Sequence, residues 1–169
     1  MRVTDLCGGM VFATLLLCAG SAGAQQVAGP AVSLSAGARA YDRGEALVVA
    51  LRAEYPLARY FLLEGAGSVA DPAEGATRSA TSVFEVQAQA HLPGGRIVPY
   101  VGVGGGFARF RVELEGQAEE EAIVSASVGA RVGIRRQLSL VADARVRATA
   151  EPLDDPHADV TVGLRYRFR

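Results

Sequence analysis

The sequence predicts an all-β protein, an eight-stranded antiparallel up-and-down transmembrane β-barrel. Apolar and polar residues alternate over eight successive stretches, and alternate residues of a strand lie on opposite faces of its sheet. None of the eight expected apolar faces carries a charge, whereas nearly every polar face carries one. After residue 24, no stretch approaches the roughly 20 apolar residues of a membrane helix, so any membrane insertion must be by strands.

The first 24 residues are expected to be a secretory signal peptide. Arg2 precedes an apolar run over residues 10–19, and Ala22-Gly23-Ala24 supplies a small-x-small cleavage site. The expected domains are therefore residues 1–24, the signal peptide, and residues 25–169, the barrel. Both cysteines, Cys7 and Cys18, fall in the removed segment. The mature chain then has no disulfide, thiolate metal site or cysteine nucleophile.

The first four predicted strands are separated by turn residues or polar segments. Their apolar positions, at every second residue, run over Val32–Ala40, Leu47–Tyr55, Phe61–Val69 and Phe84–Leu92. A tight turn at residues 42–44 follows the first strand, and residues 56–58 end the second. The polar segment 71–80 is expected to be a longer loop, and residues 93–96 form a turn.

The fifth predicted strand, residues 97–115, is the one whose register is weakly specified. Val98, Tyr100 and Phe110 are expected to face lipid, with Arg109 and Arg111 facing the lumen. The glycines between residues 102 and 106 weaken the alternation, and a bulge there would reverse one end. An acidic loop at residues 116–121 is expected to follow.

The last three strands alternate most cleanly. Their apolar positions run over Val124–Ile134, Leu138–Ala148 and Val160–Phe168, separated by a turn at 136–137 and a loop at 151–157. The final strand has two aromatic residues on its apolar side and Asp159, Arg165 on the other. An even number of strands, with longer loops at one end and short turns at the other, is typical of outer-membrane barrels whose termini are periplasmic.

An eight-stranded barrel is just wide enough inside to be filled by its own side chains. Unpaired buried charges are prohibitive, so the inward-facing charges should pair with one another. The predicted lumen charge network comprises Arg39, Arg52, Glu54, Glu64, Glu85, Arg131, Asp143 and Arg145. The predicted aromatic girdles comprise Tyr55, Tyr60, Phe84, Tyr100, Phe110, Tyr166 and Phe168.

Two short motifs carry a family resemblance. Residues 99–104, Pro-Tyr-Val-Gly-Val-Gly, resemble a strand start of porin-family and OmpA-like small outer-membrane barrels. Residues 163–168 resemble the C-terminal strand of that family, although here Arg169 follows the final aromatic residue. The resemblance implies a place in the outer membrane of a Gram-negative-type envelope. It also implies outer-membrane lipid and lipopolysaccharide as surroundings, and the barrel-assembly machinery as a partner of the last strand.

The sequence predicts no catalytic residues, no cofactor and no metal site. His91 is expected to lie in the lumen and His157 in a solvated loop, with no second histidine or serine nucleophile beside either. Gly102–Gly106 lacks the spacing of a nucleotide-binding loop. A net charge of −1 gives no reason to expect nucleic acid as a partner.

The expected function is therefore structural or interactive: envelope integrity, adhesion or a surface contact, with the lumen plugged by paired charges. The alternatives are a narrow porin-like channel, a soluble lipocalin-like ligand-binding barrel with its apolar faces inward, and, more distantly, a lipid A-modifying enzyme. Glu119–Glu121 is expected to be a solvated loop tip, or else to hold divalent cations that bridge lipopolysaccharide phosphates. Arg43 and Arg78 are candidates to meet those phosphates directly.

Overall fold

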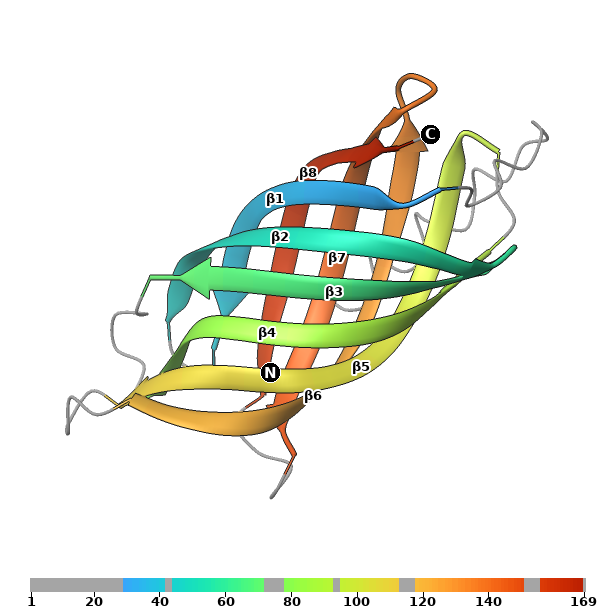
Figure 1. The fold of residues 1–169 in the computed structure, drawn as a ribbon. Helices are drawn as coiled ribbons and strands as arrows, with labels where there is room; N and C mark the ends of the chain where they lie inside the picture. Colours follow the sequence, from blue (N-terminus) through green and yellow to red (C-terminus); the bar gives the residue numbers. More distant parts are fainter. Residues whose placement is uncertain are drawn as a thin grey trace, which may run out of the picture.

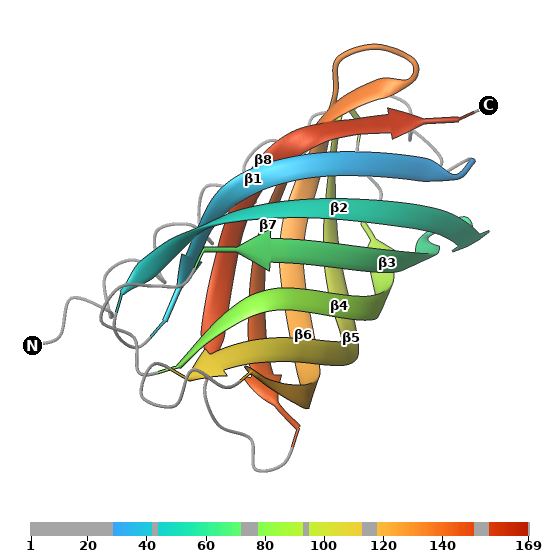
Figure 2. The ribbon, with the colours of Figure 1, turned by 60° about the vertical axis from the view of Figure 1, so that its left-hand side comes forward.

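The protein is a closed barrel of antiparallel strands (Figures 1 and 2). The computed structural model describes residues 29–41, 44–71, 78–92, 95–112, 118–150 and 156–168. The strands are β1 (Ala31–Ala40), β2 (Glu45–Ala58), β3 (Phe61–Ala70), β4 (Arg78–His91), β5 (Ile97–Val112), β6 (Ala118–Gly133), β7 (Leu138–Thr149) and β8 (His157–Arg167). Each pairs with its neighbour in sequence, and β8 pairs with β1. The predicted fold class is thus confirmed.

The predicted signal peptide, residues 1–24, lies outside the described residues, and so does Arg43. Arg78 begins β4, but its side chain is likewise outside the description. No helix long and apolar enough to cross a membrane occurs in the described part of the chain.

The up-and-down topology gives the barrel two different ends. The connections β1–β2, β3–β4, β5–β6 and β7–β8 lie at one end, here called the loop end. The other three connections and Phe168 lie at the opposite end, the turn end. Two predicted loops are shorter than expected, because β4 begins at Arg78 and β6 at Ala118. Glu120 lies opposite Arg109 in the β5–β6 ladder, so the hairpin continues through the acidic run.

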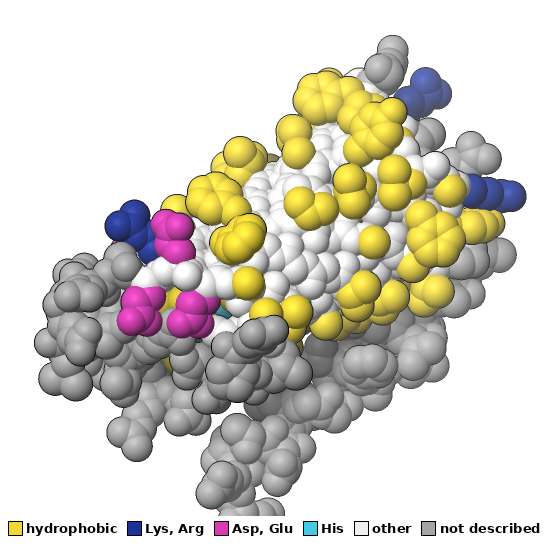
Figure 3. Space-filling model, turned by 60° about the horizontal axis from the view of Figure 1, so that its bottom comes forward, with side chains coloured by type: hydrophobic (Ala, Val, Ile, Leu, Met, Phe, Trp, Pro, Cys, Tyr) yellow, Lys and Arg dark blue, Asp and Glu magenta, His cyan; other side chains and the backbone are white. Residues whose placement is uncertain are grey.

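The outer wall of the barrel is apolar. Large hydrophobic side chains such as Leu34, Leu51, Val103 and Val162 are exposed on every second position of their strands, and Figure 3 shows such side chains over the wall. A soluble protein rarely exposes so wide an apolar surface, whereas a membrane barrel requires it. The lipocalin-like alternative needs these side chains inside, and this arrangement excludes it.

Five residues of the predicted girdles lie on the outer wall. All five are exposed: Tyr55, Tyr60, Phe84, Tyr166 and Phe168. Four of these residues belong to the turn-end half of the barrel, and Phe84 lies nearer the loop end. Tyr166 and Phe168 contact each other edge to face, with ring centroids 5.2 Å apart.

The prediction for β5 was wrong. Tyr100 and Phe110, expected in the girdles, are each 1 % exposed and point into the barrel. Val103 and Phe107 point outward instead and are 67 % and 66 % exposed. Arg109 lies on the same outward face and is exposed, so the outward face of β5 carries a charge.

The reason for the reversed face is the size of the side chains, since between residues 97 and 108 neither face carries a charge to decide it. The lumen beside β5 is occupied by polar side chains of neighbouring strands. A Cβ at Gly102 would come within 2.7 Å of Ser127 Oγ and 2.9 Å of Gln87 Oε1. The inward positions between residues 102 and 106 must therefore be small, which leaves Val103 and Phe107 for the outer wall.

Site-directed spin labelling tests this face assignment. The only cysteines of the sequence are Cys7 and Cys18, so a chain that begins after residue 24 accepts single labels. In lipid vesicles, a nitroxide at Val103→Cys or Phe107→Cys should show high collision rates with oxygen, which concentrates in hydrocarbon. The label at Ala108→Cys, which is buried in the lumen, should show low rates. The opposite order would restore the face assignment predicted from the sequence.

Candidate functional site: the charged interior of the barrel

The barrel encloses a dense set of charged side chains, none more than 6 % exposed. The set, here called the lumen network, is Arg39, Arg52, Glu54, Glu64, Glu85, Arg131, Asp143, Arg145, Arg147, Asp159 and Arg165. It contains all eight residues of the network predicted from the sequence. Sequence reasoning left out Arg147, Asp159 and Arg165, although the same alternation places them on the polar faces of β7 and β8.

The longer part of the lumen network begins near the loop end. Arg39 binds Asp159 with two nitrogens, Nε to Oδ1 at 2.7 Å and Nη2 to Oδ2 at 3.0 Å. Arg147 then joins Asp159 Oδ2 at 2.6 Å to Glu85 Oε1 at 2.7 Å. Glu85 also accepts a hydrogen bond from Arg145. Each carboxylate here is shared by two guanidinium groups.

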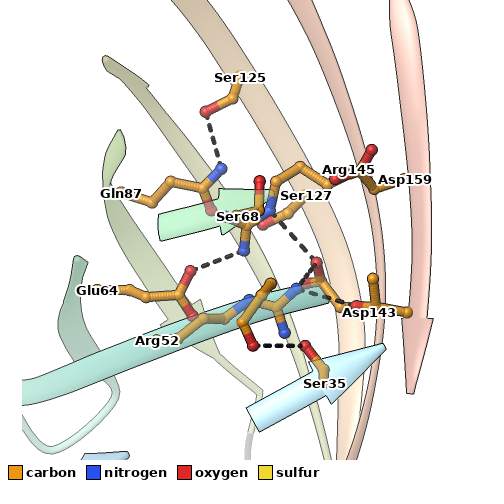
Figure 4. A network of polar contacts seen from close by, with 12 residues as sticks. Ser35, Arg52, Glu64, Ser68, Gln87, Ser125, Ser127, Asp143, Arg145 and Asp159 are labelled. Carbon is orange, nitrogen blue, oxygen red and sulfur yellow. Dashed lines mark hydrogen bonds and ion pairs between the residues drawn. The ribbon is translucent and has the colours of Figure 1, made fainter. Parts of the chain in front are cut away.

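Arg145 extends this chain across the lumen (Figure 4). Its Nη2 lies 2.7 Å from Glu64 Oε1, and its Nε lies 3.3 Å from Asp143 Oδ1. Asp143 in turn binds Arg52 Nη2 at 3.1 Å. The longer part of the lumen network therefore joins four arginines to four carboxylates and has no net charge.

The shorter part of the lumen network lies toward the turn end. Glu54 binds Arg131 Nη2 at 3.0 Å through Oε1 and Arg165 Nε at 2.8 Å through Oε2. Gln89 connects the two parts: its Nε2 donates to Glu64 at 2.8 Å, and its Oε1 accepts from Arg131 at 2.8 Å. With two arginines and one carboxylate, this part has one positive charge in excess.

Tyr100 supports both parts from inside the barrel. Its hydroxyl donates to Asp143 Oδ2 at 2.7 Å, and the guanidinium carbon of Arg131 lies 4.4 Å from its ring centroid. Its ring also stacks on His91, with centroids 5.6 Å apart. His91 lies in the lumen, with a ring nitrogen 2.8 Å from Arg131 Nη1. The aromatic residue expected at the lipid interface thus packs against the buried charges.

An apolar cluster occupies the interior at the loop end. It consists of Ala80, Val83, Ala108, Phe110 and Ile123, with Tyr41 packed against it. His157 is buried beside it and contacts the rings of Tyr41 and Phe110, with centroid distances of 5.8 and 6.2 Å. The expectation of a solvated His157 was wrong, because β8 already begins at this residue and pairs it with Arg147.

This arrangement is built for mutual neutralisation. Burying a charge in a low-dielectric interior costs several kcal/mol, which only close pairing and hydrogen bonding offset. The planar guanidinium fork can bind two carboxylates at once, and the sequence contains 17 arginines and no lysine. No group of three or more histidine, cysteine or acidic side chains placed to hold a metal ion occurs among the described residues.

Comparison with known proteins gives one family match. The family profile described as "Outer membrane protein beta-barrel domain" matches residues 10–168. No curated protein matches the sequence.

Solved structures of the same architecture are distant in sequence. Neisserial surface protein A superposes with a TM-score of 0.65 at 11 % identity, over 82 % of this chain and 96 % of the other. The N-terminal β-barrel domain of Pseudomonas aeruginosa OprF superposes with a TM-score of 0.65 at 12 % identity, over 82 % of this chain and 97 % of the other. The outer membrane enzyme PagL superposes with a TM-score of 0.52 at 16 % identity, over 82 % of this chain and 99 % of the other. At such identities the likeness concerns the fold alone, and PagL shows that an enzyme can have this fold.

Removing one central arginine should destabilise the barrel strongly. Arg145→Met leaves Glu64, Glu85 and Asp143 without a shared cation, and breaking a buried ion pair costs about 3–5 kcal/mol. Arg135→Met, at the exposed β6–β7 turn, is the matched control and should change stability by less than about 0.5 kcal/mol. Urea unfolding in lipid vesicles measures both. Equal stability of the two variants would contradict the assigned pairing.

Proposed function

The chain belongs to the outer-membrane β-barrel family, and from that premise we propose that it is a structural or adhesive protein with a plugged lumen. In this proposal it acts through its presence in the membrane and the surface at its loop end, not through transport or catalysis. The loop end faces the outside of the cell. Residues 1–24 are a signal peptide that is removed during export. β8 presents the signal recognised by the barrel-assembly machinery.

One observation carries the plugged lumen: ion pairs that join opposite walls of the barrel. In a ring of eight strands, β3 and β7 are four apart, and so are β2 and β6. Glu64 of β3 lies 2.7 Å from Arg145 of β7, and Glu54 of β2 lies 3.0 Å from Arg131 of β6. Two separate cross-lumen contacts support a closed interior.

The apolar cluster at the loop end adds a second obstacle to ions. Phe110 and Ile123 are buried there beside Tyr41, so a hydrated ion that entered from the loops would have to shed its water before reaching Arg39. Arg39 Nη1 and the Tyr41 hydroxyl both donate to the carbonyl oxygen of Ala80, at 2.8 and 3.0 Å. This favours the plugged barrel over the narrow channel.

The pairing of the buried carboxylates with arginines supports a non-catalytic role. Glu54, Glu64, Glu85, Asp143 and Asp159 each bind at least one arginine, and an acid–base catalyst needs a carboxylate or histidine that can exchange protons with a substrate. A surface role also fits the acidic side chains exposed at the loop end, among them Glu45, Asp71 and Glu120. Figure 3 shows acidic side chains gathered at one end of the barrel.

Planar-bilayer recording tests the plug. The purified protein should give no stepwise current, because both cross-lumen pairs are intact. The double variant Glu64→Ala, Arg145→Ala removes both members of one cross-lumen pair. Heat-dependent gel mobility shows that the variant is a folded barrel, and the folded variant should give small channel openings. A steady conductance from the unaltered protein would establish the channel alternative.

Mass analysis and surface labelling test the export and the orientation. Protein extracted from outer membranes should begin at Gln25, after Ala22-Gly23-Ala24. In intact cells, a membrane-impermeant maleimide should label Asp71→Cys at the loop end and leave Arg135→Cys at the turn end unlabelled. The reverse labelling would invert the barrel, and a chain that retains residues 1–24 would contradict the cleavage.

A further inference from the structure

A groove crosses the outer wall of the barrel over β2, β3, β4 and β5. Its volume is about 700 Å³. The residues that shape it are Leu51, Gly65, Gly67, Phe84, Gly105 and Phe107. In the strand ladders Leu51 lies beside Gly67, Gly67 beside Phe84, and Phe84 beside Phe107, so the lining continues across four strands. The groove is open to the surroundings of the barrel and its walls are almost entirely apolar.

Two of the glycines in this groove are not required by packing. A Cβ at Gly65 would meet nothing within 4 Å, and one at Gly67 would make only ordinary contact with the Phe84 ring, at 3.4 Å. Glycine inside a strand weakens it, and one recognised reason for its presence is the close approach of a ligand. Packing within the barrel therefore does not explain the hollow over β3.

A cation stands at the loop-end side of the groove. Arg109 is exposed on the outer face of β5, two residues or roughly 7 Å beyond Phe107. Among the described residues, no hydrogen bond or ion pair engages its guanidinium group. An arginine on the lipid-facing wall is costly at mid-membrane and much less so at the interface, where it can reach a headgroup.

We propose that the groove holds one acyl chain of lipid A, with a phosphate of the same lipid bound by Arg109. The inference rests on the proposed orientation, which places the loop end in the leaflet of lipopolysaccharide. From Arg109 to Gly105 is four residues, roughly 13 Å along the strand. At a strand tilt of about 40° this is roughly 10 Å of depth, against roughly 15 Å for half of the hydrocarbon thickness. A chain whose headgroup lies at Arg109 thus reaches the glycines. Guanidinium and phosphate pair with good geometry.

Glu120 gives the site a second, opposite influence. It is exposed and lies directly across the β5–β6 ladder from Arg109. A carboxylate next to the phosphate repels it, so in the absence of divalent cations Glu120→Gln should bind lipid A more tightly than the unaltered protein. The direction of this change separates phosphate recognition at Arg109 from simple burial of an acyl chain.

Native mass spectrometry of the barrel in detergent, with lipid A added in steps, measures the binding. The unaltered protein should retain one lipid A whose own mass is unchanged, and retain phosphatidylcholine much more weakly. Gly65→Leu places a side chain in the groove at a position where a Cβ meets nothing within 4 Å. It should weaken lipid A binding about tenfold, the equivalent of roughly two buried methylene groups. Arg109→Gln should weaken it about fivefold, the upper range for an exposed ion pair.

Matched controls lie on the opposite side and at the other end of the barrel. Ala142→Leu adds the same side chain on the outer face of β7, diametrically opposite β3, and Arg135→Gln removes an exposed arginine at the turn end. Both should bind lipid A as the unaltered protein does. The proposal would be overturned if Gly65→Leu bound lipid A as tightly as the unaltered protein, or if the unaltered protein retained phosphatidylcholine as well as lipid A. A protein dimer that Gly65→Leu abolishes would also overturn it.

The maleimide labelling keeps this proposal separable from the proposed orientation. Labelling at Asp71→Cys with no loss of lipid A binding in Gly65→Leu overturns the groove alone. Labelling at Arg135→Cys instead removes the loop end from the lipopolysaccharide leaflet, and it overturns both the orientation and lipid A as the physiological occupant.

Discussion

Hydrocarbon offers no hydrogen-bond partner, and this constraint determines the whole architecture. A sheet in a membrane can leave no edge, because each unpaired backbone group there costs several kcal/mol. The closure of β1 on β8, from Ala31 opposite Arg167 to Ala40 opposite Ala158, removes both edges at once. Closure in turn fixes an inside and an outside, so every second side chain must suit hydrocarbon and the others must fit a narrow lumen. The alternation in the sequence is the consequence of that division.

The charged side chains that face the lumen must then be neutralised. The lumen is too narrow to hydrate six arginines and five carboxylates freely, so their charges are balanced by contact. The balance is not made pair by pair: Asp159 binds Arg39 and Arg147, Glu85 binds Arg147 and Arg145, and Arg145 also binds Glu64 on the opposite wall of the barrel. Because the links join strands on opposite walls, the same contacts that neutralise charge also brace the barrel.

Most of the face assignments were predictable from the sequence, and the exception has a physical cause. On β7, Asp143 and Arg145 mark the inner face, since neither can face lipid. On β5 no charge precedes Arg109, and both faces are apolar, so hydrophobicity alone could not choose between them. The choice depended on the bulk of Gln87 and Ser127, which are distant in sequence. The sequence likewise could not predict which charged side chains pair within the lumen. Arg145 and Glu64 are 81 residues apart, and their contact depends on the tilt and stagger of the strands.

The glycines of the wall fall into two kinds, and the difference bears on how the outer surface is used. Gly102 faces inward, and a side chain there would collide with Ser127 and Gln87, so its smallness is explained by the lumen. Gly65 faces outward, and a side chain there would collide with nothing. A strand residue that forgoes both packing area and β-propensity without an internal reason needs an external one. In a membrane the external neighbour is a lipid. The reversed face of β5 places the cation Arg109 on the same outer wall. The outer surface of this barrel is thus shaped as specifically as its interior.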